Sequence, residues 1–168
     1  IQAVIFQDAH EELFMSNNTV SVSLEQEEAY RFKVEFGSET PAILTDEPAP
    51  LGAAAGPSPV ELLVSAVASC LTDSLIFALN KFKQPSDGMR TEASGELGRN
   101  ADNRLRVAKV NVTLHLGHAQ GEIERLERIL DQFEQFCTVS QSVAQCLPVH
   151  LTVMDSEGVQ LKQSVLGG

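Results

Sequence analysis

The sequence predicts an α+β fold whose sheet is mostly antiparallel. Segments in which apolar and polar residues alternate lie both before and after a single long apolar segment, residues 58–82. The alternating segments are joined by short polar or glycine-containing turns, and regular strand–helix repeats are absent. A chain of 168 residues is long enough to bury a sizeable core in one domain.

The first half of the chain predicts a hairpin and a short third strand. "TVSVSL" (19–24) and "YRFKVEFG" (30–37) alternate and read as strands, with the polar "EQEEA" (25–29) as the turn between them. A short strand is expected near 42–45, followed by a proline-rich loop. Residues 1–18 form an N-terminal extension, for which the pattern leaves a short strand or a helical turn open.

The apolar segment predicts a helix from Pro59 to about Lys83. Ser58 is a suitable N-cap, Pro59 fits the first helical position, and Glu61 completes a capping box. The helix is apolar around most of its circumference, so we expect it to pack against a sheet and against another helix or another subunit. Its longest uncharged core, residues 62–71, is about half the roughly 20 residues of a membrane span, so no membrane crossing is expected.

The second half of the chain predicts two strands, two helical pieces and a final strand. The strands are 90–97 and 105–116, and "RNADN" is the turn between them. Residues 121–136 have helical periodicity, "CTVSQSVAQC" (137–146) begins another helical piece, and "LPVHLTVMD" (147–155) is a strand. We place the domain at 19–154, with 155–168 as a C-terminal tail that is either frayed or a terminal strand.

Composition excludes several classes of function. The net charge of −11 disfavours nucleic acids and anionic membranes as partners. Phosphate-binding glycine loops, C-x-x-C pairs and classical histidine metal spacings are missing, so neither a metal nor another cofactor is expected. The N-terminus "IQAVIFQDAH" lacks the basic region and cleavage site of a signal peptide, and we expect a cytoplasmic protein.

The three cysteines differ in their surroundings. Cys70 lies inside the apolar helix, where a cysteine most simply acts as a small hydrophobe. Cys137 lies at the start of a predicted helix, where free backbone N–H groups favour a thiolate. Cys146 reads as core or edge packing. From the residues alone, Cys137 is therefore the more reactive thiol.

Two motifs in order resemble a known family. "GPSPVELLVSAVASC" is followed, 67 residues after its cysteine, by "FCTVSQSV", and both resemble the osmotically inducible protein C / organic hydroperoxide resistance family over about 19–154. "P-x-E-L-L" is typical of a less characterised branch. The resemblance implies an OsmC-like fold, in which mostly antiparallel sheets wrap around long central helices in an intertwined homodimer.

The resemblance also implies thiol peroxidase chemistry in oxidative-stress defence, without metal or flavin. By position, Cys70 attacks an organic hydroperoxide and becomes a sulfenic acid, Cys137 resolves it as a disulfide, and an external dithiol reduces that disulfide. Arg31 is the nearest candidate for the family's hairpin arginine, which would favour the Cys70 thiolate. A groove including Leu63, Val67 and Phe77 is expected to hold the alkyl part of the substrate.

The chain departs from the family pattern in two places. The glycine–arginine turn is absent, and Val60 occupies the position of the family's glutamate, with Glu61 one residue later. One residue is about 100° of helix rotation, so Glu61 cannot take the same role. These departures keep two alternatives open: a dimer that binds a small apolar or electrophilic ligand without turning over peroxide, or a structural thiol pair in a shared fold.

Overall fold

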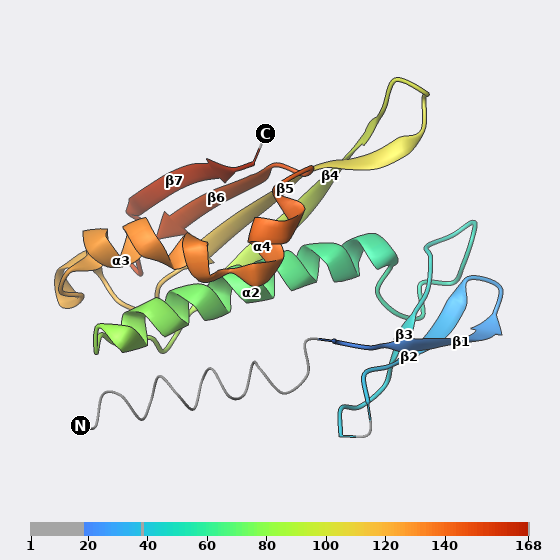
Figure 1. Ribbon diagram of the computed structural model, residues 1–168, viewed down its shortest axis with the longest axis horizontal. Coiled ribbons are helices and arrows are strands. Elements are labelled where there is room, and N and C mark those ends of the chain that lie inside the picture. The colour runs from blue at the N-terminus through green and yellow to red at the C-terminus, as the bar shows by residue number, and fades with distance from the viewer. Residues whose placement is uncertain (1–18, 38, 168) are drawn as a thin grey trace. The chain divides into compact units, whose positions relative to one another are not determined.

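The computed structural model describes residues 19–37 and 39–167 (Figure 1). The predicted extension, residues 1–18, lies outside the described residues. The chain forms two compact units, residues 1–58 and 59–168, and each is described by itself.

The N-terminal unit contains a three-stranded antiparallel sheet in the order β1 (Ser23–Glu28), β2 (Arg31–Glu35) and β3 (Ile43–Thr45). The hairpin forms, but the expected turn "EQEEA" is wrong because most of it lies in β1 and the chain reverses at Ala29 and Tyr30. This later reversal pairs Leu24 with Val34, so apolar residues of the two strands stay opposite each other.

The proline-rich loop after β3 is organised by a buried carboxylate. Asp46 is 2% exposed, and its side chain accepts backbone N–H bonds from Glu47, Ala53 and Ala55 at 2.9, 3.0 and 3.1 Å. These bonds, led by that from Ala55, hold the pKa of Asp46 below its usual range. A Cβ at Gly52 would lie 2.2 Å from Asp46 Oδ1, so the loop closes around the carboxylate only with glycine there.

The C-terminal unit consists of a long helix, a four-stranded sheet and shorter helices. Helix α2 spans Pro59–Lys81, and the sheet has the order β4 (Arg90–Arg99), β5 (Leu105–His115), β6 (Val149–Met154) and β7 (Gln160–Leu166). Only the β5–β6 pair of this sheet is parallel. The α+β fold with mostly antiparallel sheets is therefore confirmed, and the tail contributes a terminal strand.

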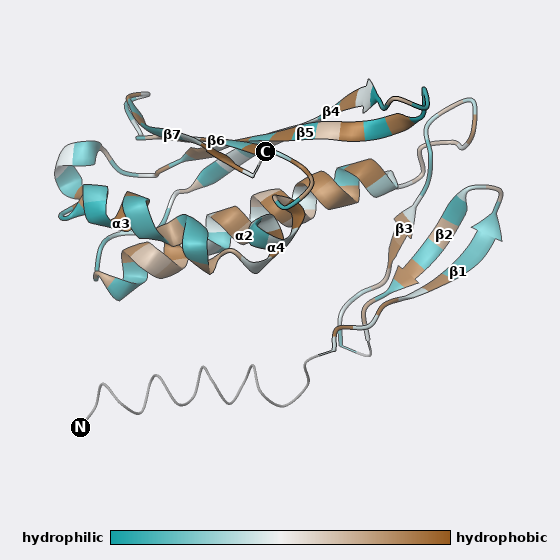
Figure 2. Cartoon of the chain, turned by 45° about the horizontal axis from the view of Figure 1, so that its top comes forward, coloured by the Kyte–Doolittle hydropathy of each residue, from teal (hydrophilic) through white to brown (hydrophobic). Residues whose placement is uncertain are grey.

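The segment 120–143 is more broken than its periodicity predicts. It contains the 3₁₀ turn η1 (Gln120–Glu122), helix α3 (Leu126–Gln132), the 3₁₀ turn η2 (Phe133–Phe136) and helix α4 (Thr138–Val143). Arg125, directly before α3, has the left-handed backbone φ of 59°, which interrupts a helix. The helices α2, α3 and α4 lie on one face of the sheet (Figures 1 and 2).

The core lies between α2 and this sheet face. The buried residues of α2 recur every three or four positions and are Val67, Leu71, Ser74, Leu75, Ala78 and Leu79. They pack in one cluster with alternate residues of β5 and β6, such as Val112 and Leu151. At Gly95 of β4 the helix comes close, since an added Cβ would lie 2.9 Å from Val64 Cγ2.

The sequence predicted no membrane crossing because the uncharged segment 62–71 is too short. The length of the observed helix does not support that reason. Helix α2 has 23 residues and meets the criteria of length and composition for a span. Buried helices of soluble proteins meet the same criteria. Within its unit α2 contacts β4, β5, α3 and α4, and 39% of its apolar window is buried there.

Candidate active site

Two cysteines that lie 67 residues apart in the sequence meet in the C-terminal unit. Cys70 comes from the middle of α2, and Cys137 lies between η2 and α4. Cys70 Sγ accepts the backbone N–H of Val139, two residues after Cys137, at 3.4 Å, and the Cys70 thiol lies close enough to raise the pKa of Cys137. The two cysteines that the family resemblance pairs are thus neighbours, and both are free thiols.

The rotation of α2 determines how Cys70 is presented. Leu71 is fully buried in the core, and the neighbouring Thr72 Oγ1 lies 2.7 Å from Thr91 Oγ1 of β4. Ser74 Oγ donates to the carbonyl oxygen of Cys70 at 2.8 Å. These contacts fix the helix against the sheet and leave Cys70 half-buried at the edge of the core.

Cys137 is fully buried and remains a protonated thiol. It is the N-cap of α4, and its Sγ accepts the backbone N–H of Ser140 at 3.4 Å. Burial first, and then the hydrogen bond with Cys70, raises the pKa of Cys137, although the bonds from Ser140 act the other way. The ranking from residues alone, which made Cys137 the more reactive thiol, is therefore wrong, because burial outweighs the start of a short helix.

The arrangement assigns different chemistry to the two sulfurs. Cys70 Sγ accepts the backbone N–H of Val139, while Cys137 Sγ accepts that of Ser140. Of these two cysteines, Cys70 alone has part of its surface open to solvent.

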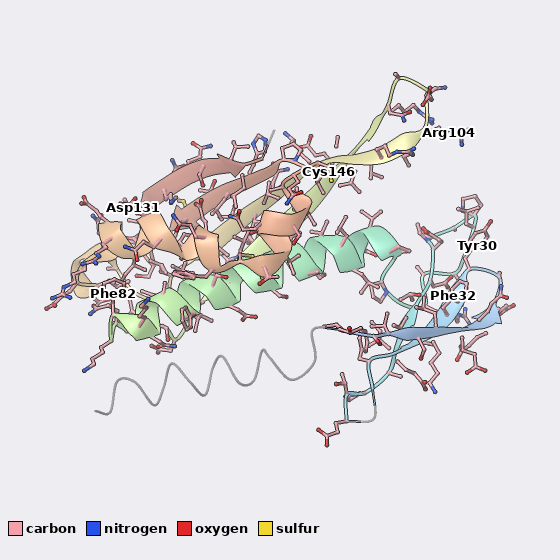
Figure 3. All side chains as sticks on the ribbon, in the orientation of Figure 1. Tyr30, Phe32, Phe82, Arg104, Asp131 and Cys146 are labelled. Carbon is pink, nitrogen blue, oxygen red and sulfur yellow. The ribbon has the colours of Figure 1, made fainter. Side chains whose placement is uncertain are left out.

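Cys146 lies away from this pair. It is exposed just beyond the end of α4 (Figure 3), and its Sγ donates to Val143 O at 3.6 Å. Of the two expected environments, core packing is wrong. The thiol lies at an edge because α4 ends at Val143 and the chain turns outward before β6.

Arg31 lies on β2, in the N-terminal unit. Its Nε is 3.6 Å from Asp46 Oδ2, and its Nη1 is 3.6 Å from Glu28 Oε2. The Nε atom is buried without a hydrogen-bond partner among the described residues. Within its own unit the guanidinium therefore faces carboxylates, and its role toward Cys70 stays a prediction.

An aromatic pair beside Cys137 is a feature that sequence reasoning only half identified. Phe77 and Phe136 meet edge to face with ring centroids 5.7 Å apart, and both are more than a third exposed. Lys81 Nζ lies 5.5 Å from the centroid of the Phe136 ring. Phe77 was expected to line a groove, but Val67 was wrongly included because it is fully buried. The motif "FCTVSQSV" already placed Phe136 next to the thiol.

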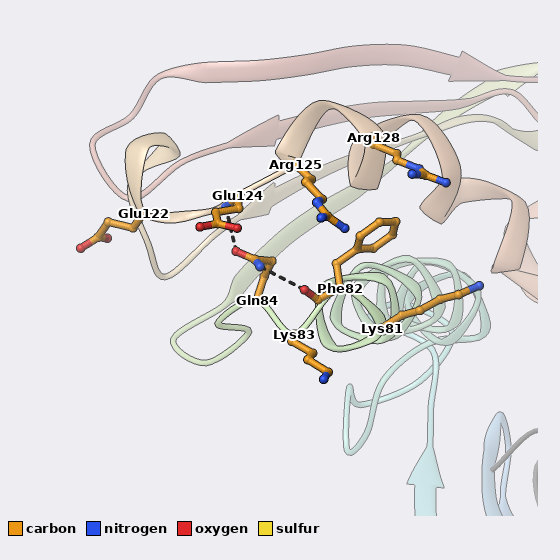
Figure 4. Close-up of a pocket in the computed structure, with 8 residues that line it drawn as sticks. All are labelled: Lys81, Phe82, Lys83, Gln84, Glu122, Glu124, Arg125 and Arg128. Atoms are coloured by element: carbon orange, nitrogen blue, oxygen red, sulfur yellow. Dashed lines mark hydrogen bonds between the residues drawn. The ribbon is translucent and has the colours of Figure 1, made fainter. Parts of the chain in front are cut away.

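A separate hollow of about 910 Å³ lies at the C-terminal end of α2 (Figure 4). Arg125, directly before α3, and Arg128 of α3 extend toward Phe82 (Figure 4), and Arg128 lies 5.5 Å from the Phe82 ring centroid. Gln84 links the two sides, since its Oε1 accepts the N–H of Glu124 at 2.7 Å. With Lys81 and Lys83 on the same rim, the hollow is locally basic, but neither thiol lines it.

Within 19–37 and 39–167, no group of three or more histidine, cysteine, aspartate or glutamate side chains is placed to hold a metal ion.

The raised pKa of Cys137 predicts the order in which the thiols react. At pH 7 to 8, iodoacetamide should modify Cys146 and Cys70 well before Cys137, as measured by mass spectrometry of timed digests. The modification of Cys137 should require a higher pH, because its thiolate forms only there. In denaturant the three rates should become similar. Modification of native Cys137 as fast as Cys70 would contradict this assignment.

Comparison with known proteins agrees with the fold and the motif. A family profile described as OsmC-like protein matches residues 52–152. That range holds both cysteines of the pair. Comparison with curated proteins gives no significant match.

Solved structures share the fold at low sequence identity. An OsmC-like protein of unknown function from Vibrio cholerae is 20% identical and superposes with a TM-score of 0.69, covering 81% of this chain and 99% of that chain. The organic hydroperoxide resistance protein OhrB of Bacillus subtilis is 18% identical, with a TM-score of 0.60, covering 80% and 97%. An organic hydroperoxide resistance protein from Elizabethkingia anophelis is 15% identical, with a TM-score of 0.65, covering 84% and 99%.

These likenesses establish the architecture, and the profile covers more than half of the sequence, including both motifs that carry the resemblance. The chain belongs to the OsmC-like protein family.

Proposed function

We propose that this protein is a thiol-dependent peroxidase that reduces organic hydroperoxides through a Cys70–Cys137 disulfide. The observation that carries the proposal is that a half-buried Cys70 thiol lies against the segment of the fully buried Cys137, with the Val139 N–H 3.4 Å from Cys70 Sγ. Membership of the OsmC-like family supports a peroxide-related redox function, as do structural neighbours named organic hydroperoxide resistance proteins.

In the first step, the Cys70 thiolate attacks the terminal oxygen of the hydroperoxide. An S–O bond forms, the O–O bond breaks, and the alkoxide leaves as an alcohol after taking a proton. Cys70 becomes a sulfenic acid. The N–H of Val139, 3.4 Å from Cys70 Sγ, stabilises the attacking thiolate.

In the second step, Cys137 sulfur attacks Cys70 sulfur. The S–S bond forms, the S–O bond breaks, and hydroxide leaves as water with the proton released by Cys137. The raised pKa of Cys137 means that this proton stays on sulfur until the attack. An external dithiol then reduces the disulfide by thiol–disulfide exchange, returns both thiols and is itself oxidised.

The proposal includes a homodimer formed through the solvent-facing side of α2. Ser65, Ala66, Ser69, Asp73 and Phe77 are exposed and recur at helical spacing along that side. Small residues at such spacing allow another helix to approach closely. A second copy of α2 is the occupant that the family resemblance implies, and it would cover apolar surface that this chain leaves open.

The second candidate function is a binder of small apolar or electrophilic ligands. The exposed Phe77–Phe136 pair beside the thiols favours it, because an aromatic surface can hold an apolar group without any turnover. The peroxidase and the binder differ in how the sulfurs respond to added peroxide. A purely structural thiol pair is expected to respond as the binder does.

The peroxidase proposal predicts a specific disulfide. One equivalent of cumene hydroperoxide should convert the wild type to a Cys70–Cys137 disulfide, with Cys146 left free, in mapped digests. Cys137→Ser should stop at a Cys70 sulfenic acid, which excess peroxide drives to the sulfinic acid. Cys70→Ser should consume no peroxide beyond background, and Cys146→Ser should behave as the wild type.

The alternatives give different results in the same experiment. A binder or a structural pair should oxidise slowly, with no preferred disulfide and no difference among the cysteine variants. A mapped Cys137–Cys146 disulfide, or faster reaction with hydrogen peroxide than with cumene hydroperoxide, would refute the mechanism as assigned.

We also propose that Arg31 favours the Cys70 thiolate. Arg31→Ala should then slow the alkylation of Cys70 at pH 7 by about tenfold, equivalent to about one pKa unit of lost electrostatic support, measured by timed iodoacetamide labelling. Lys33→Ala is the matched control, since Lys33 lies two residues along the same strand and pairs with Glu35 at 2.6 Å. Equal rates in the two variants would assign the thiolate's stabilisation to Val139 alone.

The homodimer proposal predicts that the protein sediments at about twice the 18.2 kDa chain mass at micromolar concentration. Ser69→Arg should shift the equilibrium toward monomer, because a long charged side chain prevents close helix approach. Lys83→Glu, beyond the end of α2, should not. A wild-type monomer over the whole concentration range would exclude a dimer of this kind.

A further inference from the structure

The segment that carries Cys137 is linked to β7 by a polar cluster that lies outside the family motif. Lys162 Nζ lies 3.1 Å from Glu134 Oε1 and donates to the carbonyl of Leu130 at 2.5 Å. Ser164 Oγ donates to the same glutamate oxygen at 2.7 Å. We refer to Glu134, Lys162 and Ser164 as the β7 anchor.

The β7 anchor crosses from the edge of the sheet to the helical layer. Lys162 and Ser164 are two residues apart in β7, so both side chains point to the same face. The Lys162 and Glu134 side chains are only 19% and 18% exposed, and Lys162 Nζ lies 5.7 Å from the centroid of the buried Phe133 ring. A pair this sheltered is better ordered than an ion pair in open solvent.

The main chain of Glu134 connects the β7 anchor to the thiol. Its carbonyl oxygen accepts the backbone N–H of Cys137 at 3.3 Å and the side-chain amide of Gln141 at 3.1 Å. Cys137 O in turn accepts the N–H of Gln141 at 3.0 Å. One residue therefore joins β7, through its side chain, to the turn that presents Cys137 and to the first turns of α4.

We infer that the β7 anchor positions Cys137 for its attack on the Cys70 sulfenic acid. This inference rests on the proposed function. Glu134, Lys162 and Ser164 act as positioning residues, because they touch the Cys137 segment and not the reacting sulfurs. Lys162 and Ser164 lie beyond residues 52–152, the range matched by the family profile, so this support comes from the chain's own last strand.

The physical basis is the effective concentration of one thiol at the other. Closure of the disulfide is intramolecular, and its rate depends on how often Cys137 sulfur lies in line with the S–O bond of Cys70. Releasing Glu134 from β7 allows η2 and α4 to move together with Cys137. The first step depends less on this segment, because Cys70 is fixed by α2 and by Thr72 with Thr91 of β4. Its link to the segment is the hydrogen bond from the Val139 N–H.

The test compares two matched double variants. Glu134→Gln with Lys162→Met removes both charges and leaves no unpaired buried charge. Glutamine has the length of glutamate, and methionine is one atom shorter than lysine. Glu96→Gln with Lys109→Met removes a similar cross-strand pair, 2.9 Å apart on β4 and β5, as the control. Ser164→Ala is a milder variant that removes only one hydrogen bond of the β7 anchor.

The kinetic readout separates the two steps. Sulfenic acid formation is measured with cumene hydroperoxide and a sulfenate-trapping dione in the Cys137→Ser background, and closure by quenched mass mapping with both cysteines present. We expect closure to slow about tenfold in the anchor variant and about threefold in Ser164→Ala, with sulfenic acid formation slowed by clearly less and an unchanged control pair. Unchanged or faster closure, or equal slowing in the control, would overturn the inference.

An equilibrium readout remains valid even if the protein does not reduce peroxides. In glutathione redox buffers without peroxide, the Cys70–Cys137 disulfide should be less favoured in the anchor variant. A tenfold change in the buffer ratio at half-oxidation corresponds to about 30 mV. The same half-oxidation point in the wild type and the anchor variant would refute the positioning role. A wild type that forms this disulfide in glutathione but does not react with hydroperoxide would refute only the proposed function.

Discussion

Helix α2 fixes the C-terminal unit because its buried residues allow only one rotation about its axis. Val67, Leu71, Leu75 and Leu79 face the sheet, and turning the helix by one residue would expose them at a cost of about 1.5–3 kcal/mol each. With that face in place, Cys70 lies at the boundary between the core and solvent. The position of the Cys70 sulfur is therefore determined by the packing of α2 in the core, and not by a loop.

Much of the fold could be predicted because the relevant signals are local. Alternation marked β5, and the proline start with a long apolar run marked α2, so both elements were placed within two residues of their observed ends. The region 120–136 was predicted less well, since helical periodicity there reflects one buried stripe and not one continuous helix. The left-handed backbone of Arg125 has no signature in an arginine. The hairpin register likewise depended on cross-strand pairing, which single-strand alternation does not specify.

The candidate site also has features that the sequence predicts and features that it does not. The pairing of Cys70 with Cys137 came from the resemblance of two motifs to a known family, and the structure places Cys70 against the Cys137 segment. Their different environments could not be predicted, because burial is a property of the whole packed unit. A cysteine at a helix start looks activated in the sequence, yet Cys137 is fully buried and keeps its proton. The bond from Val139 to Cys70 was also hidden, since any residue can donate a backbone N–H.

The complete enclosure of Cys137 has a consequence for how the proposed enzyme would fail. Of the pair, only Cys70 is open to solvent, so irreversible oxidation of the site would fall on that sulfur. Closure of the disulfide is unimolecular, whereas further oxidation of the sulfenic acid is bimolecular in peroxide. At one peroxide concentration the rate of closure equals the rate of further oxidation. Above that concentration, inactivation would be faster than closure of the disulfide. The protein would thus have a built-in ceiling of oxidant tolerance, determined by the mobility of one short segment.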